Sequence, residues 1–146
     1  MSLDVTALAD QVALRRTAEL YALGADRRDK ALWRQALSED CVIEGPGFQL
    51  EGLEANLGSI DMLGVMFRRT LHRVHQVVAE VSGDGAEGET YSTADHLLKE
   101  GDAILVWSIR YLDNWRREAG LWRFARRKLI VEWEETRPVT VRESAA

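Results

Sequence analysis

The sequence predicts an α+β fold in which helices near the start of the chain pack on one face of a strongly curved, mixed or antiparallel sheet. Apolar residues recur at helical spacing through most of the first half of the chain, as in VTALADQVALRRTAEL. The second half instead holds four long stretches rich in β-branched and aromatic residues, separated by short turns such as SGDG and REAG. A curved sheet of this kind can wrap around its helices and leave an internal pocket.

The helical elements come first in the chain. We expect a helix over residues 4–23, capped by Asp4 and ending near Gly24, and a short helix over residues 29–37. The stretch CVIEGPGFQLEG predicts two short strands joined by the Gly-Pro-Gly turn, and a further helix follows over residues 52–69. The four long strands are expected over residues 71–81, 86–99, 103–116 and 121–133.

Length and composition indicate a single globular domain. The 146 residues are 46% hydrophobic and 29% charged, which allows a sizeable core, placed here at about residues 5–134. We expect the tail, residues 135–146, to be mobile. No apolar run is long enough to span a bilayer, no segment resembles a signal peptide, and Cys41 has no second cysteine to pair with. These observations predict a cytoplasmic protein that makes no membrane contact.

The charge pattern argues against a nucleic-acid partner. The net charge is −5, and acidic and basic residues are mixed along the chain instead of forming a concentrated basic face. In the run that comes nearest to a basic patch, strand alternation puts Arg127 on the face opposite to Arg126 and Lys128. Arg126 and Lys128 are then best interpreted as part of a solvated strand face.

Two of the three histidines, His72 and His75, lie in the stretch TLHRVHQ at the start of the first long strand. Residues three apart on a strand point to opposite faces of the sheet. Both faces of this strand mix polar and apolar residues, so alternation alone does not decide which histidine points inward. On the next strand, His96 shares a face with small residues, a pattern typical of a sheet that leaves room for a ligand: Ala86, Gly88, Thr90, Ser92 and Ala94.

Tyr21 and Asp26 are the polar candidates around the end of the first helix. Asp26 could also be a turn residue that bonds its own backbone, Tyr21 a core aromatic residue, and a strand histidine a structural group. Cys41 lies in no nucleophile motif, so a buried small side chain is its better interpretation. The sequence contains no phosphate-binding glycine loop, dinucleotide fingerprint, G-x-S-x-G or H-E-x-x-H pattern, and its histidines lack a familiar metal-ligand spacing.

Several short patterns, taken in order, resemble the SnoaL-like branch of the nuclear transport factor 2-like superfamily. They are YALGADRRDKALWRQALSEDCVIEG, TLHRVHQ, VSGDGAEG, IRYLDNW and GLWRFARR. The resemblance covers nearly the whole chain, from about residue 5 to residue 134. It implies a cone formed by a curved sheet and helices, with a deep pocket inside the cone.

Within that superfamily, the candidate site looks most like those of scytalone dehydratase, hexachlorocyclohexane dehydrochlorinase and bile acid 7α-dehydratase. The resemblance implies a lyase that eliminates water or halide without a cofactor or a metal. His72 would be the general base that takes a C–H proton, and Asp26 would support it through the other ring nitrogen. Tyr21 or His96 would hydrogen-bond a carbonyl or a leaving hydroxyl, and Arg127 would stabilise developing negative charge.

The implied pocket is apolar, which suits a hydrophobic ring compound as the substrate. The residues expected to line it are Trp107, Ile109, Tyr111, Met62, Met66, Phe67 and Val74. Departures from the family pattern, such as Ala25 and Ile109 where scytalone dehydratase has polar residues, leave the substrate itself undefined.

Other functions remain open on the same fold. Ketosteroid isomerisation ranks below elimination because the position of the isomerase base is Gly45, whereas a polyketide cyclase could use the same Asp–His pair. A structural module predicts a filled cone with Asp26 and His72 apart, and a ligand sensor or carrier predicts an open pocket without turnover. The resemblance also implies a homodimer or homotrimer formed through the outer sheet face, with contributions from His75, Arg73, Tyr91 and Trp115.

Overall fold

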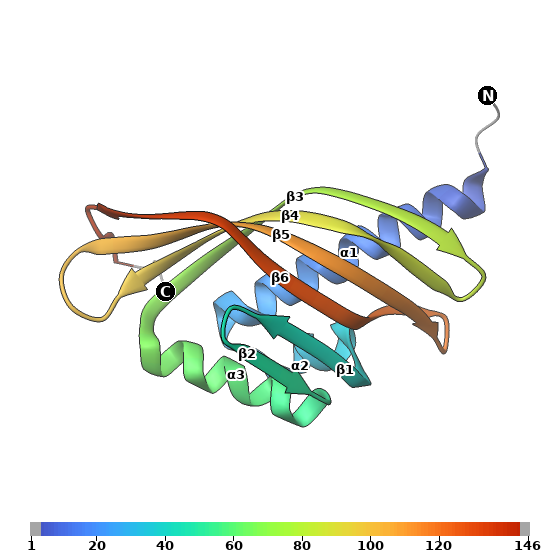
Figure 1. Cartoon of the computed structure of the whole chain (residues 1–146), viewed down its shortest axis with the longest axis horizontal. Coiled ribbons are helices and arrows are strands. Elements are labelled where there is room, and N and C mark those ends of the chain that lie inside the picture. The colour runs from blue at the N-terminus through green and yellow to red at the C-terminus, as the bar shows by residue number, and fades with distance from the viewer. Residues whose placement is uncertain (1–3, 144–146) are drawn as a thin grey trace.

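A computed structural model describes residues 4–143 of the chain. Its elements are α1 (Val5–Arg27), α2 (Lys30–Ala36), β1 (Leu37–Gly45), β2 (Phe48–Glu51), α3 (Leu53–Met66), β3 (Phe67–Ser82), β4 (Gly85–Leu98), β5 (Ala103–Glu118) and β6 (Leu121–Pro138). The six strands form one sheet in the order β2-β1-β6-β5-β4-β3 (Figure 1). All neighbouring strands are antiparallel except β1 and β6, which are parallel.

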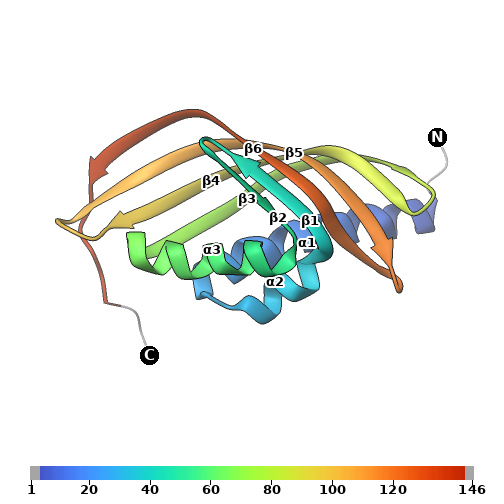
Figure 2. The same cartoon turned by 60° about the horizontal axis from the view of Figure 1, so that its bottom comes forward.

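The predicted α+β class and the mixed, curved sheet are confirmed. The sheet arches over the three helices, which all lie on its concave side (Figure 2). The main core fills the space between these layers, with Leu14, Leu57 and Phe124 among its fully buried side chains. No helix of the described residues is both long and apolar enough to cross a membrane.

The first helix is longer than predicted and carries its last turn past Gly24. Asp4 caps its start as expected, accepting a hydrogen bond from the backbone N–H of Thr6 at 2.9 Å. A Cβ at Gly24 would lie 2.3 Å from the Trp33 ring, so the glycine is needed for close packing of α2 and not to end the helix. The Trp33 Nε1–H then donates to the Tyr21 carbonyl oxygen at 2.8 Å.

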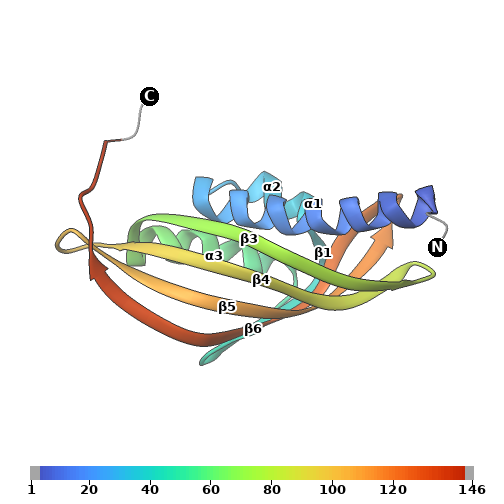
Figure 3. The same ribbon diagram turned by 90° about the horizontal axis from the view of Figure 1, so that it is seen from above.

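The edge strand β3 is protected by α1, which runs alongside it (Figure 3). The side chain of Gln11 donates to the carbonyl oxygen of Ala79 at 3.0 Å. The Arg15 guanidinium donates to the carbonyl oxygens of Val74 and His75. These bonds occupy carbonyl groups that a free sheet edge would otherwise present to another chain.

A β-bulge in β3 changes which residues face the core. The register with β4 shifts between Val74 and Val77. Before the shift, His72 and Val74 face inward, and after it Val77 and Ala79 pack against the core. Strict alternation, which puts even-numbered residues up to Glu80 on the face of His72, is therefore wrong beyond the bulge, because the extra residue reverses the phase of the strand.

The last strand continues beyond its predicted end at residue 133, because residues up to Pro138 pair with β5. Val139 and Val141 then pack against a small apolar cluster formed by Leu97, Ile104 and Val106. The predicted start of a tail at residue 135 is thus wrong, since the chain remains in the sheet there. Residues 144–146 of that tail lie outside the described residues.

Gly88 provides a test of the close contact between β3 and β4. A Cβ at this position would lie 1.9 Å from the carbonyl oxygen of Val78, a backbone atom that cannot turn away. Gly88→Ala is expected to lower the free energy of unfolding by about 1–3 kcal/mol in urea denaturation. The matched control is Gly58→Ala in α3, where a Cβ meets no atom within 4 Å, and which should raise stability by about 0.5–1 kcal/mol. Equal stabilities of the two variants would contradict the close strand contact.

Candidate functional site

Asp26 and His72 meet where the end of α1 lies against β3. The Asp26 Oδ1 atom lies 2.6 Å from His72 Nδ1, and its Oδ2 atom accepts the backbone N–H of His72 at 2.8 Å. The Thr70 hydroxyl adds a third bond, to Oδ1, at 3.1 Å. Asp26 therefore does not bond its own backbone as a turn residue would, and instead links the helix to the strand.

The contact with Asp26 fixes which ring nitrogen of His72 carries the proton when the ring is neutral. A carboxylate only accepts hydrogen bonds, so the short contact places a proton on Nδ1, and in the neutral ring Nε2 then carries the lone pair. The His72 side chain is 9% exposed and that of Asp26 is 14% exposed. This is the arrangement a general base requires: an orienting carboxylate on one nitrogen and a free acceptor on the other.

The space beside His72 is small. It forms a cavity of about 10 Å³, room for about one water molecule. Its lining residues are Ala18, Tyr21, Ala22, His72, Val74, Thr90, Ser92, Tyr111 and Arg127. The expectation of a pocket wide enough for a ring compound is therefore wrong for this conformation, because large side chains from α1, β5 and β6 occupy the inside of the cone.

Arg127 is one of these side chains, and it is held in a buried ion pair. Its Nε and Nη2 atoms donate to Asp113 at 2.7 and 3.1 Å, and the Thr90 hydroxyl donates to Asp113 at 2.6 Å. The guanidinium also lies over the rings of Tyr111 and Phe124, 3.7 and 3.9 Å from their centroids. Burial alone lowers the pKa of Arg127, but the charge and hydrogen bonds of Asp113 outweigh it and raise the pKa, so the group stays charged.

A second register shift explains why Arg127 faces the core together with Phe124. Trp115 pairs with Phe124, whereas the preceding Asn114 pairs with Arg126, so the strand β6 has one extra residue at this point. Arg126 stays on the exposed side and pairs with Glu44 at 2.7 Å. The prediction that Arg127 lies opposite to Arg126 is confirmed.

Tyr21 borders the cavity from α1. Its ring stacks on Trp33 at a centroid distance of 4.5 Å and meets Tyr111 edge-on at 6.1 Å. Burial raises the pKa of Tyr21 well above its usual value, and burial also raises the pKa of Tyr111 to about 12. Both phenols therefore remain protonated at working pH and can only enter a reaction as hydrogen-bond donors or acceptors.

His96 lies next to His72, with the two ring centroids 6.0 Å apart. It packs between Phe67 and Trp107, at centroid distances of 4.7 and 5.1 Å. Its Nδ1–H donates to the carbonyl oxygen of Leu105 at 3.0 Å. Burial lowers the pKa of His96, so the ring is neutral at working pH and presents a lone pair on Nε2.

The remaining predicted lining residues separate into four groups. Val74 and Tyr111 line the cavity, Phe67 and Trp107 flank His96, and Ile109 is buried in the core. Met62 and Met66 do not reach the site, and each is 54% exposed. They lie on the outward side of α3 because the helix buries the opposite side, which carries Leu53, Asn56, Leu57 and Ile60.

Two polar residues of the site were missed by the sequence analysis, Thr70 and Asp113. Asp113 shares the inward face of β5 with Ile109 and Tyr111, and two-residue alternation from these residues would have placed it inside. A buried acid needs a partner, and Arg127 is opposite it in the register. Thr70 gives no comparable signal, because an isolated threonine in a strand is common.

Cys41 is fully buried, as expected, and burial raises the pKa of its thiol to about 12. Across residues 4–143, no three His, Cys, Asp or Glu side chains gather in a way that could hold a metal ion.

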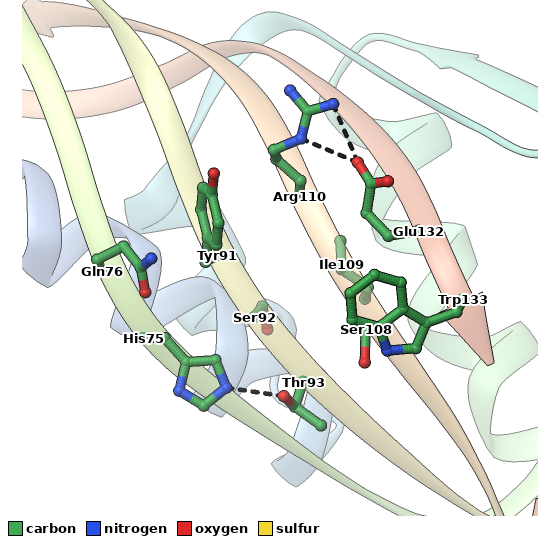
Figure 4. Close-up of a pocket in the computed structure, with 10 residues that line it drawn as sticks. All are labelled: His75, Gln76, Tyr91, Ser92, Thr93, Ser108, Ile109, Arg110, Glu132 and Trp133. Atoms are coloured by element: carbon green, nitrogen blue, oxygen red, sulfur yellow. Dashed lines mark hydrogen bonds and ion pairs between the residues drawn. The ribbon is translucent and has the colours of Figure 1, made fainter. Parts of the chain in front are cut away.

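His75 points away from this site, to the outer face of the sheet. There a hollow of about 300 Å³ lies across β3, β4, β5 and β6 (Figure 4). His75 Nε2 lies 2.7 Å from the Thr93 hydroxyl, and Arg110 pairs with Glu132 on the far side of the hollow. The two histidines of TLHRVHQ therefore face opposite sides, with His72 inside and His75 outside.

The outer face differs in part from its predicted composition. Trp133, which the sequence analysis did not single out, is 71% exposed beside the hollow, and Tyr91 is 38% exposed. Arg73 lies on this face and pairs with Asp95 at 2.9 Å. Trp115 is only 2% exposed, so its predicted place at a subunit contact is wrong, because it lies on the inward face of β5 with Asp113.

The family follows from one comparison. A sequence model of the SnoaL-like domain matches residues 6–128, most of the chain. The chain belongs to the SnoaL-like family. No curated protein matches the sequence.

Solved structures share this SnoaL-like fold. A type 2 hexachlorocyclohexane dehydrochlorinase is 21% identical with a TM-score of 0.83, over 99% of this chain and 98% of that one. A scytalone dehydratase-like protein from Novosphingobium aromaticivorans is 24% identical with a TM-score of 0.81, over 96% and 94%. A type 3 dehydrochlorinase from Novosphingobium barchaimii is 18% identical with a TM-score of 0.82, over 99% of each chain. At these identities the likeness establishes the fold.

The buried pair beside the cavity gives a stability prediction. Asp113→Asn removes the charge that compensates Arg127, so it should lower the free energy of unfolding by about 3–5 kcal/mol in urea denaturation. The control is Asp61→Asn, which breaks an exposed pair with Lys30 and should cost less than about 1 kcal/mol. Similar losses in both variants would show that Asp113 does not compensate a buried charge on Arg127.

Proposed function

We propose that the protein is a cofactor-independent lyase that eliminates water or halide from a hydrophobic cyclic small molecule. The observation that carries this proposal is the 2.6 Å contact between Asp26 and His72 Nδ1, on a ring that borders the internal cavity. The imidazolium of an ordinary histidine has a pKa of about 6.5, so a neutral histidine can accept a proton at working pH. Asp26 supports it by stabilising the imidazolium that forms.

The proposed reaction needs one proton acceptor and one site for negative charge. His72 Nε2 takes the acidic proton from a carbon next to a carbonyl group, and the electron pair of that C–H bond moves into an enolate. When the enolate collapses, the C=C bond forms and the β-substituent leaves. A hydroxyl leaves as water after taking the proton back from the imidazolium, whereas a halide leaves as the anion.

The other buried polar groups fit supporting roles. Tyr21 stays protonated, so its hydroxyl can donate to the substrate carbonyl or to the enolate oxygen. Two of the three guanidinium nitrogens of Arg127 are bound to Asp113, which leaves Nη1 for the same oxygen. His96 fits less well as a donor, because its only ring proton in the neutral state is used by the Leu105 carbonyl.

The substrate class follows from the lining of the site. Aromatic and aliphatic side chains surround the few polar groups, an environment that suits an apolar ring with one carbonyl group. Because the cavity holds little more than one water molecule, substrate entry requires side chains or the α1–β3 contact to move apart. The described structure is then the closed form of the enzyme.

The same small cavity favours a second candidate function, a structural module of this family that binds no substrate. That reading predicts a filled cone, which the structure has, but it also predicts that Asp26 and His72 lie apart, which they do not. Isomerisation with a base at the end of β1 has less support, because Gly45 lies there and the neighbouring Glu44 is paired with Arg126.

An elimination screen distinguishes the two candidates. The probes are cyclic β-hydroxy ketones and cyclic β-chloro ketones, followed by enone absorbance and by released chloride. His72→Ala should lower turnover by roughly 10²–10⁴-fold, because it removes the general base, with the far-UV circular dichroism unchanged. His75→Ala, on the outer face, should keep full activity. A His72→Ala protein as active as the wild type would rule out the proposed base, and no turnover of any probe would favour the structural module.

Self-association through the outer sheet face is also part of this proposal. The hollow of Figure 4 is bordered by the exposed rings of Tyr91 and Trp133, which are 38% and 71% exposed. Exposed apolar side chains that gather on one sheet face are typical of a protein contact. The partner proposed here is a second copy of the chain, in a dimer or a trimer.

Trp133→Glu tests this contact by sedimentation velocity. It should weaken self-association roughly 10-fold or more, because a tryptophan buried at an interface contributes about 2 kcal/mol or more. Leu121→Glu is the matched control, since Leu121 is 52% exposed at the turn between β5 and β6. A wild-type protein that sediments as a monomer at all concentrations would overturn the proposal.

A further inference from the structure

We infer that Arg28 is a positioning residue for the proposed base, acting on His72 through the hydroxyl of Thr70 and the carboxylate of Asp26. The inference deepens the proposed function and rests on it, because it concerns how the same Asp–His pair is held. Arg28 itself does not touch His72 in the described structure; each link between them is a hydrogen bond.

The direction of each link follows from which groups can donate. Arg28 Nη1 donates to Thr70 Oγ1 at 2.8 Å. A guanidinium has no acceptor, so the hydroxyl must accept this bond and its own proton remains available. That proton is donated to Asp26 Oδ1 at 3.1 Å, the same oxygen that lies 2.6 Å from His72 Nδ1. Thr70 is 3% exposed, so water does not compete for this hydroxyl.

The position of Arg28 is costly for the fold, which argues against a purely structural role. Arg28 ends α1 with φ 53°, a left-handed conformation that a non-glycine residue rarely adopts. Its Nη1 also donates to the carbonyl oxygen of Ala25, yet its Nη2 is buried without a hydrogen-bond partner. Strained backbone and unpaired buried donors are found preferentially at functional sites.

The hydrogen-bond chain predicts the direction in which the pKa of His72 changes when Arg28 or Thr70 is replaced. The Arg28 cation and the Thr70 proton both draw electron density from Asp26, so they weaken its stabilisation of the imidazolium. Removing either group should therefore raise the pKa of His72. The other titratable side chains that face His72 stay unchanged in these variants: Asp26 and Tyr21 from α1, His96 from β4, Tyr111 from β5 and Arg127 from β6.

The experiment is an NMR titration of the His72 ring, which needs no substrate. The chain has three histidines, so each Cε1–H signal can be assigned by single substitution. Arg28→Met and Thr70→Val are each expected to raise the pKa of His72, with Arg28→Met raising it by about 1 unit. Arg27→Met is the matched control, because it removes a neighbouring charge from an exposed side chain at the same helix end, and it should leave the titration unchanged.

The double variant tests whether Arg28 acts through Thr70. If it does, Arg28→Met should shift the His72 pKa less in the Thr70→Val background than in the wild type. Equal shifts in both backgrounds, or a shift as large from Arg27→Met, would overturn the inference. If Arg28→Met does not fold, an unchanged titration in Thr70→Val overturns it instead. A shifted titration in a protein that turns over no probe would reject the proposed lyase activity alone.

Discussion

The carboxylate of Asp26 is the contact on which the inner organisation of this protein depends. It accepts three hydrogen bonds from β3, two from His72 and one from Thr70, and so fixes the end of α1 to the edge strand of the sheet. Because α1 also carries Tyr21, the same contact sets the distance between the proposed base and the proposed oxygen donor. The Asp26 side chain therefore determines both the position of α1 on the sheet and the spacing of the two proposed functional groups.

The cone contains two buried polar pairs of different character. The Arg127–Asp113 pair is sealed among aromatic rings and joined by two hydrogen bonds, so it is a rigid part of the core. The Asp26–His72 pair lies at the boundary between helix and sheet and keeps one ring nitrogen uncommitted. The ion pair therefore lies at the centre of the core, and the proposed base lies at the boundary between α1 and the sheet.

The fold class, the order of elements and the inner position of His72 could be predicted, but the faces of two strands could not. The bulges near Val74 and in β6 before Arg127 each reverse the alternation, and nothing in the local sequence marks them. Asp26 and His72 were found by resemblance, since an aspartate at a helix end has a commoner explanation. The prediction that Met62 and Met66 line the pocket is wrong because other residues occupy the inward side of α3, and an apolar residue on a helix does not by itself show which side faces the core. The filled cavity depends on how large rings pack together, which no pattern of single residues describes.

The hydrogen bonds from Gln11 and Arg15 to the carbonyls of β3 have a consequence for the behaviour of the chain in concentrated solution. β3 is a 16-residue strand at the open side of the sheet, and its neighbour on that side is a helix and not another strand. Unwinding of the first turns of α1 would release these carbonyls as a template for strand addition by another molecule. The N-terminal helix thus protects the edge of β3 from pairing with another molecule, and ordered aggregation would require this helix to detach first.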